Sequence, residues 1–168
     1  MKNIFAKSLL MASTVALTTL AAHAEYERVN MTVFGMDCAP CAHAIHVSMK
    51  GIAGVNAVNV DLNTGLVTVK LTPGNSAAIR QFNQAVEKNG FTHKDATVVA
   101  RGRLTGTVNA PFLEVAGTQD RFALAPAAVA VNISALLGKT VTVSGVLPQV
   151  GKGKVPDTLR YNTIIEGK

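Results

Sequence analysis

Two cysteines separated by two residues set the strongest constraint on this 168-residue chain. Cys38 and Cys41 are its only cysteines, and two thiols at this spacing can bind one soft metal ion or form a disulfide with each other. An alternating apolar run before them predicts a strand near residues 28–34, and the apolar pair Ile45 and Met49 after them predicts a helix. We therefore expect the cysteines where a strand turns into a helix. The helix dipole there favours the thiolate, which is the form of sulfur that binds metal.

The N-terminal segment has the pattern of a secretory signal peptide. Lys2 and Lys7 precede an apolar stretch over residues 9–20, and Ala22-His23-Ala24 has the small-x-small form of a cleavage site. A membrane anchor is the alternative, but the stretch is short and interrupted by Ser and Thr. We expect residues 1–24 to be removed and the rest to be periplasmic. Such a compartment is oxidising, so the cysteines must be kept reduced or metal-bound to act as ligands.

The chain after this segment predicts a first folded unit over residues 25–99. Alternating apolar residues flank the turn Asn63-Thr64-Gly65, which is typical of a hairpin. Ser76 is a suitable N-cap for a second helix with an apolar stripe, and a last strand is expected over residues 92–99. The predicted fold is α+β and ferredoxin-like, with the order βαββαβ and both helices on one face of the sheet.

This motif, spacing and element order together resemble the heavy-metal-associated domain. The family includes periplasmic mercury-binding proteins, copper chaperones and the N-terminal domains of metal-pumping ATPases. The positions that carry the resemblance are Gly35-Met36, Cys38 and Cys41, Ile45 and Met49, Gly54-Val55, and Gly90-Phe91. The resemblance implies that the thiolates of Cys38 and Cys41 bind the metal, that Met36 packs under the loop and that Phe91 lies beside the site.

Asp37 departs from the pattern of the copper and mercury members, which mostly carry threonine before the first cysteine. Gly-Met-Asp-Cys is similar to the corresponding segment of zinc, cadmium and lead pumps, where the carboxylate joins the two thiolates. Two thiolates alone suit Cu(I) or Hg(II), whereas Zn(II) and Cd(II) prefer more ligands and accept a carboxylate oxygen. Asp37 is therefore a candidate accessory ligand, and the alternative is that it only caps the helix.

Three histidines lie near the motif in the sequence or in the expected fold. His43 and His46 follow the cysteines on the expected helix, and His93 lies near the same end of the sheet. We expect all three to be solvent-facing or structural rather than ligands.

The remaining residues, 100–168, predict a small all-β unit. Five short apolar runs are separated by turn signals, and a short helix over residues 132–137, capped by Asn132, is expected between the third and the fourth. This order resembles an OB-fold barrel. Gly145 is expected to form a bulge in the fourth strand.

We expect an exported metallochaperone or scavenger that holds one ion, Cu(I), Hg(II), Zn(II) or Cd(II), between Cys38 and Cys41. It would pass the ion by ligand exchange to a membrane transporter or another envelope protein. The alternatives are a periplasmic thiol-disulfide oxidoreductase that uses Cys-Ala-Pro-Cys, and a metal-sensing adaptor that docks a transporter through the barrel. The sequence offers no Ser/His/Asp set and no phosphate-binding loop, so no enzymatic activity is expected. The charge surplus is modest, with 16 basic and 10 acidic residues, and nucleic acid is not an expected partner.

Overall fold

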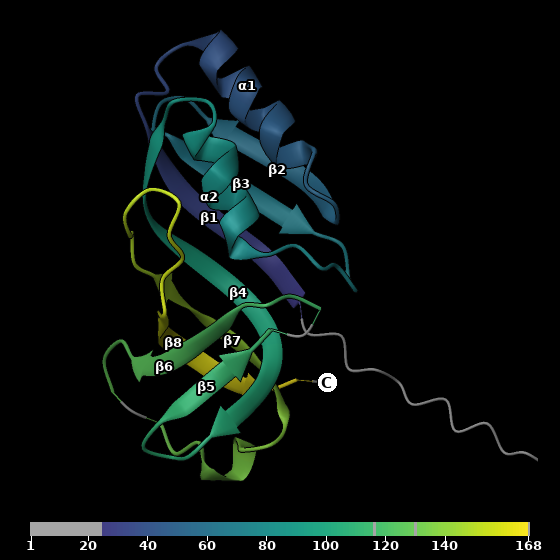
Figure 1. The fold of residues 1–168 in the computed structure, drawn as a ribbon, viewed down its shortest axis with the longest axis vertical. Helices are drawn as coiled ribbons and strands as arrows, with labels where there is room; N and C mark the ends of the chain where they lie inside the picture. The colour runs from purple at the N-terminus through teal and green to yellow at the C-terminus, as the bar shows by residue number, and fades with distance from the viewer. Residues whose placement is uncertain (1–24, 116, 130, 168) are drawn as a thin grey trace, which may run out of the picture.

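The structure is a computed structural model that describes residues 25–115, 117–129 and 131–167. The predicted signal peptide and its cleavage site after Ala24 lie outside the described residues. The molecule is elongated, with two helices and a sheet at one end and a barrel of strands at the other (Figure 1). No helix in the described part of the chain is long and apolar enough to cross a membrane.

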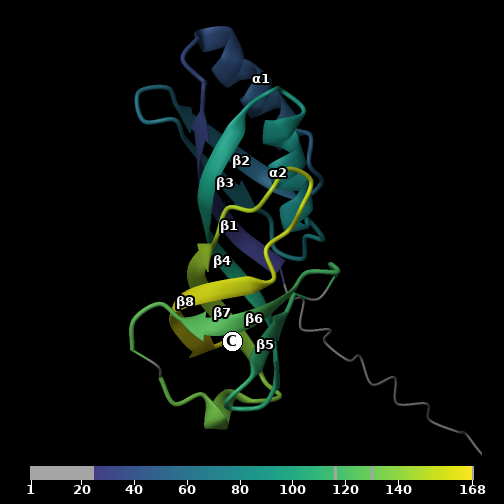
Figure 2. The same cartoon turned by 60° about the vertical axis from the view of Figure 1, so that its left-hand side comes forward.

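The N-terminal half confirms the predicted ferredoxin-like order. It contains, in chain order, β1 (Glu25–Phe34), α1 (Ala39–Lys50), β2 (Val55–Asp61), β3 (Leu66–Leu71), α2 (Ile79–Glu87) and β4 (Thr92–Gly106). The strands are antiparallel in the order β2-β3-β1-β4, and Figure 2 shows both helices on the same face of the sheet. The other face carries the alternate, mostly polar side chains of each strand.

The apolar pattern of the sequence explains this packing. On β1, the alternating residues Val29, Met31 and Val33 are buried, and α1 buries Ile45 and Met49 against them. These two helical positions are four apart, so they lie on one side of the helix. The predicted core of this half is thereby confirmed.

The second helix begins later than predicted. Its N-cap is Ala78, which has no capping side chain, so the prediction that Ser76 caps it is wrong. The first amides of α2 are satisfied by other groups instead. The Gln81 side chain accepts a hydrogen bond from the Ala78 N–H at 2.9 Å, and Asp120 in the barrel accepts one from the Ile79 N–H at 2.7 Å.

β4 belongs to both halves of the molecule. Its 15 residues pair with β1 from Thr92 to Arg101 and with β7 from Ala96 to Arg103. The strand predicted over residues 92–99 therefore continues to Gly106, and the predicted domain boundary after residue 99 lies within it. Gly102 permits this arrangement, because a Cβ at that position would lie only 2.4 Å from the Glu114 carbonyl oxygen on β5.

The C-terminal half closes into a barrel that is compatible with an OB-like fold. Its further elements are β5 (Pro111–Glu114), β6 (Arg121–Pro126), the 3-10 turn η1 (Ser134–Leu136), β7 (Thr140–Leu147) and β8 (Thr158–Glu166). The order around the barrel is β4-β5-β6-β8-β7, and β7 returns to pair with β4. β6 and β8 are parallel, and the other neighbouring strands of the barrel are antiparallel. The bulge predicted at Gly145 lies on the partner strand instead, because Ser144 and Gly145 of β7 pair with Thr163 and Tyr161 and leave Asn162 of β8 as the extra residue. The predicted helix over residues 132–137 is reduced to the three residues of η1.

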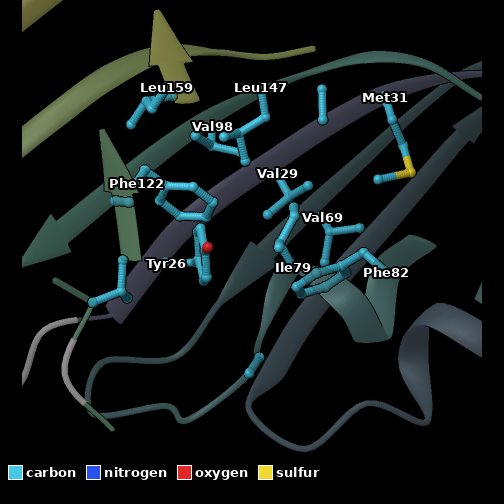
Figure 3. Packing of buried hydrophobic residues seen from close by; sticks show 14 of the residues in the cluster. Tyr26, Val29, Met31, Val69, Ile79, Phe82, Val98, Phe122, Leu147 and Leu159 are labelled. Carbon is cyan, nitrogen blue, oxygen red and sulfur yellow. The ribbon is translucent and has the colours of Figure 1, made fainter. Parts of the chain in front are cut away.

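One hydrophobic core runs through both halves. Tyr26, at the start of β1, is fully buried and touches Phe82 of α2 edge-on, with the ring centroids 6.5 Å apart. Figure 3 shows Tyr26 between the Phe82 side of the core and Phe122 of the barrel. The Tyr26 hydroxyl donates a 2.7 Å hydrogen bond to Asp120, which also accepts the α2 amide. Burial and the neighbouring Asp120 carboxylate raise the pKa of Tyr26 well above its ordinary value.

Candidate metal-binding site

The cysteines lie where β1 turns into α1, as predicted. β1 ends at Phe34, and the backbone then turns through Gly35, whose φ of 78° favours glycine. Cys38 is the N-cap of α1 in extended conformation, and the Cys41 N–H donates a hydrogen bond to its Sγ at 3.1 Å. Pro40 lies in the first turn, where its missing N–H costs no helical hydrogen bond. The Cys38 sulfur therefore accepts an amide hydrogen bond and lies at the positive end of the helix dipole.

The structure shows the oxidised form of the pair. Cys38 and Cys41 form a disulfide, with their Cα atoms 5.1 Å apart. A disulfide has no thiolate to offer, so metal binding by this pair requires its reduction by two electrons. The helix N-terminus then favours the thiolate over the thiol at Cys38.

Two apolar side chains flank the loop. Met36 is 4% exposed and belongs to the hydrophobic core beneath the loop. Phe91, in the loop between α2 and β4, is partly buried and lies close to the glycine of the motif. Its Cδ1 would be 3.6 Å from a Cβ at Gly35. These contacts hold one side of the loop, whereas Asp37, Ala39 and the ring of Pro40 are exposed on the other.

Asp37 does not cap the helix. The N-cap is Cys38, so the alternative interpretation of Asp37 as the capping residue is wrong. The Asp37 side chain is exposed and has no hydrogen-bond partner among the described residues. Among the described residues, the structure does not bring this carboxylate together with the two cysteines as a group of three metal ligands.

The three histidines do not form a metal-binding cluster with other ligand side chains in the described part of the chain. His43 is exposed on α1 and His46 is partly buried on the same helix. His93 is 8% exposed on β4, and its Nδ1 lies 2.7 Å from the Lys94 carbonyl oxygen. Within residues 25–115, 117–129 and 131–167, no group of three or more His, Cys, Asp or Glu side chains is arranged to hold a metal.

The sequence did not indicate which part of the barrel approaches this end of the molecule. The loop between β7 and β8 reaches the segment after α2, where Val150 and Lys152 line a depression together with Phe91. Val150 is about 60 residues away from Phe91 in the sequence, and the loop contains no recognisable motif. Only the folded barrel shows that the loop approaches Phe91.

Comparisons with known proteins agree with this geometry. Residues 30–92 match the heavy-metal-associated domain family. The chain is 31% identical over 65 residues to the copper chaperone CopZ of Bacillus subtilis, a match that covers 39% of this chain and 93% of that protein. It is also 31% identical over 61 residues to CopZ of Staphylococcus aureus (strain JH9), covering 36% of this chain and 88% of that protein. Among solved structures, the N-terminal domain of ZntA in its apo form is 33% identical with a TM-score of 0.36, covering 41% of this chain and 90% of that one.

The chain belongs to the heavy-metal-associated domain family. Association with heavy metals is the class of function that the family assigns to residues 30–92. The matched relatives account for about two fifths of the chain, at 39% for CopZ of B. subtilis, and the barrel extends beyond the matched family region.

Proposed function

We propose that the chain is a metallochaperone or scavenger that binds one soft metal ion between the thiolates of Cys38 and Cys41. The observation that carries the proposal is the position of the cysteine pair. Cys38 Sγ accepts an amide hydrogen bond at the N-terminus of α1, and the loop is open to solvent on one side. The copper chaperones to which the N-terminal half is similar favour the same function.

Ligand exchange follows from this exposure. Two thiolates satisfy Cu(I) or Hg(II), which accept two soft ligands. An incoming thiolate from an acceptor can bind the exposed ion before one of the two cysteines leaves, so the ion never becomes free. Zn(II) or Cd(II) would need further ligands, and the carboxylate nearest to the cysteines in the sequence is that of Asp37.

We also propose that the protein is exported, on the strength of the sequence pattern of residues 1–24. Metal binding would then depend on reduction of the disulfide or on loading before oxidation.

A thiol-disulfide oxidoreductase remains the second candidate, because the structure joins the two cysteines in a disulfide. The ferredoxin-like fold argues against it, since only the Cys-Ala-Pro-Cys segment is similar to the active-site pattern of thioredoxin-like oxidoreductases. A metal-sensing adaptor that docks through the barrel is the third candidate. It would show as metal-dependent capture of a transporter by the full chain.

The test compares metal content. The full chain, purified and reduced under anaerobic conditions, is expected to bind one Cu(I), and the Cys38→Ser/Cys41→Ser variant is expected to bind none tightly. His43→Ala on the same helix is the matched control and should retain the metal. Unchanged stoichiometry in the double variant would overturn the proposal, and catalytic turnover in insulin reduction by the wild type would favour the oxidoreductase.

A further inference from the structure

The loop between β7 and β8 is fixed along α2 and β4. Arg80 Nη1 donates a 3.0 Å hydrogen bond to the Gly153 carbonyl oxygen, and the Gly153 N–H donates to the Glu87 carboxylate at 3.1 Å. The Gln149 N–H donates to Asp95 Oδ1 at 2.8 Å. Figure 2 shows the loop, in yellow, rising from the barrel to the level of α2. A segment of the barrel is thus held against the metal-binding half by three hydrogen bonds.

This loop forms one wall of a depression beside the candidate metal site. The depression has a volume of about 150 Å³. Its opposite wall contains Phe91, the residue whose ring lies against Gly35 at the start of the cysteine loop. Its other lining residues are Glu87, Gly90, Thr92, His93, Gln149, Val150 and Lys152. Neither half of the molecule forms the depression alone.

The size of the depression limits what it can hold. Sites for small molecules usually measure ~300–1,000 Å³, so this one fits a single side chain better than a cofactor or metabolite. The apolar surfaces of Phe91 and Val150 suit a short methylene stem. The Thr92 hydroxyl, the Gln149 amide and the Lys152 ammonium can all donate hydrogen bonds to a polar end.

The charge around the depression favours an acidic side chain. Both carboxylates in this region, Glu87 and Asp95, already accept backbone amides from the β7–β8 loop. Lys152 lines the depression and Lys154 follows it on the same loop, and neither lysine has an ion pair among the described residues. Lys94 lies over the Phe34 ring, 5.0 Å from its centroid, at the end of the strand that leads into the cysteine loop. The cations without a partner carboxylate on these segments therefore favour an acidic ligand.

We propose that this depression receives an aspartate or glutamate side chain of the thiol-bearing protein that exchanges metal with Cys38 and Cys41. The inference rests on the proposed metal-transfer function and adds the chemistry of the partner. The seated carboxylate aligns the acceptor thiols with the exposed side of the cysteine loop. The lysines attract an acidic acceptor and discriminate against a basic one.

The test measures Cu(I) transfer from the loaded, reduced full chain to two synthetic acceptor peptides. Each contains Cys-Gly-Gly-Cys, followed in one peptide by four glutamates and in the other by four glutamines. At low ionic strength we expect the wild type to transfer metal at least about tenfold faster to the acidic peptide, since electrostatic steering is worth ~10–10³ in rate. Lys152→Glu/Lys154→Glu should bring the ratio close to one. Lys70→Glu, on the sheet face opposite the helices, is the matched control and should leave the ratio unchanged.

A second variant separates a seated side chain from general attraction. Val150→Trp should fill the depression without changing the charge, and it should remove most of the preference for the acidic peptide. Equal rates to both peptides from the wild type, or a preference that survives Val150→Trp, would overturn the inference. So would evidence that a second copy of this chain occupies the site, seen as self-association that Val150→Trp abolishes.

The metal stoichiometry separates this inference from the proposed function. Each variant should still bind one Cu(I), which also shows that it is folded at the metal site. A wild type that binds no metal would refute the proposed function itself. A wild type that binds metal but does not distinguish the peptides would refute only the docking site.

Discussion

The two helices begin in different ways. The N-cap of α1 is Cys38, whose own sulfur accepts the Cys41 amide, so the group that caps the helix is also a candidate ligand. The N-terminus of α2 has no capping side chain of its own at Ala78, and the carboxylate of Asp120 reaches it from the barrel. The N-terminus of the first helix is therefore exposed to solvent and carries a candidate metal ligand. The N-terminus of the second helix instead connects the two halves of the molecule.

This difference indicates what the barrel does for the metal-binding half. Asp120 accepts hydrogen bonds from the Ile79 amide and from the buried hydroxyl of Tyr26, both at 2.7 Å. A single carboxylate thus links α2, β1 and the barrel. The cysteine loop has no comparable contact with the barrel among the residues described, so it can exchange ligands without disturbing this connection.

The largest expected effect comes from breaking the connection at α2. Asp120→Ala removes a helix cap, worth ~1 kcal/mol, and leaves a buried phenol hydroxyl unpaired, at ~1–3 kcal/mol. We expect a loss of about 3 kcal/mol in the free energy of unfolding, measured by urea denaturation. Gln119→Ala, at the exposed neighbouring position, is the control and should change it by less than ~0.5 kcal/mol. Equal effects from the two variants would show that the link does not stabilise the fold.

Asp37→Thr tests whether the exposed cysteine loop at the start of α1 supplies a third ligand to the metal. If the carboxylate is a ligand, its loss should lower the affinity for Cd(II) by more than about tenfold, because even the loss of a residue that only hydrogen-bonds a ligand costs about that much. Binding of Cu(I), which two thiolates satisfy, should stay nearly constant. Competition titrations of wild type and variant with both ions, under anaerobic conditions, provide the measurement. Because Asp37 is not the N-cap, the stability without metal should change by less than ~0.5 kcal/mol. A parallel shift for both ions, or none for either, would exclude Asp37 as a ligand.

Tyr26→Phe isolates one of the two hydrogen bonds of Asp120 and should cost about 1 kcal/mol at neutral pH. It should also change the response to alkaline pH. Burial, which is the larger cause, and the Asp120 carboxylate, which is the smaller, raise the pKa of Tyr26 in the folded state above the ordinary tyrosine value of 10.0. The unfolded chain therefore loses this proton first, so the stabilising contribution is complete below pH 10 and declines as the pH rises above it. Urea denaturation between pH 8 and 11 should show a steeper loss for the wild type than for the variant. Parallel curves would contradict the assignment.

The smallest effect is expected for Cys38→Ser in the presence of a reductant. Serine is a good N-cap, so the Cys41 amide keeps an acceptor and stability should remain within ~0.5 kcal/mol of the reduced wild type. Cys38→Ala, which offers no acceptor, should cost ~1 kcal/mol. If thermal or urea denaturation does not distinguish serine from alanine, the sulfur does not act as a cap.

The sequence was sufficient to predict the ferredoxin-like half because its signals are local. The alternation of Val29, Met31 and Val33 and the four-residue spacing of Ile45 and Met49 each depend on one element, and the structure confirms both. The cysteine motif with its adjoining Gly35-Met36, taken together with the order of the elements, indicated the family that the comparison shows.

The predictions that failed depend on distant contacts. The sequence predicts a start of α2 near Ser76, because nothing near this segment shows that its first amide bonds to Asp120, 41 residues away from Ile79. The sequence predicts a boundary between two units after residue 99, but β4 runs through it, and Gly102 fits the close approach of β5. The expected helix over residues 132–137 is limited to one turn, although Asn132 does accept the Ser134 amide as a cap would.

If the thiolates of Cys38 and Cys41 hold the metal, binding must depend on the redox state of this pair. Cu(I) is titrated into the same preparation of full chain, first with the disulfide intact and then after anaerobic reduction, with a competing chelator to report affinity. We expect no tight binding by the oxidised protein and one Cu(I) per chain after reduction. Tight binding of one Cu(I) by the protein with its disulfide intact would contradict this expectation.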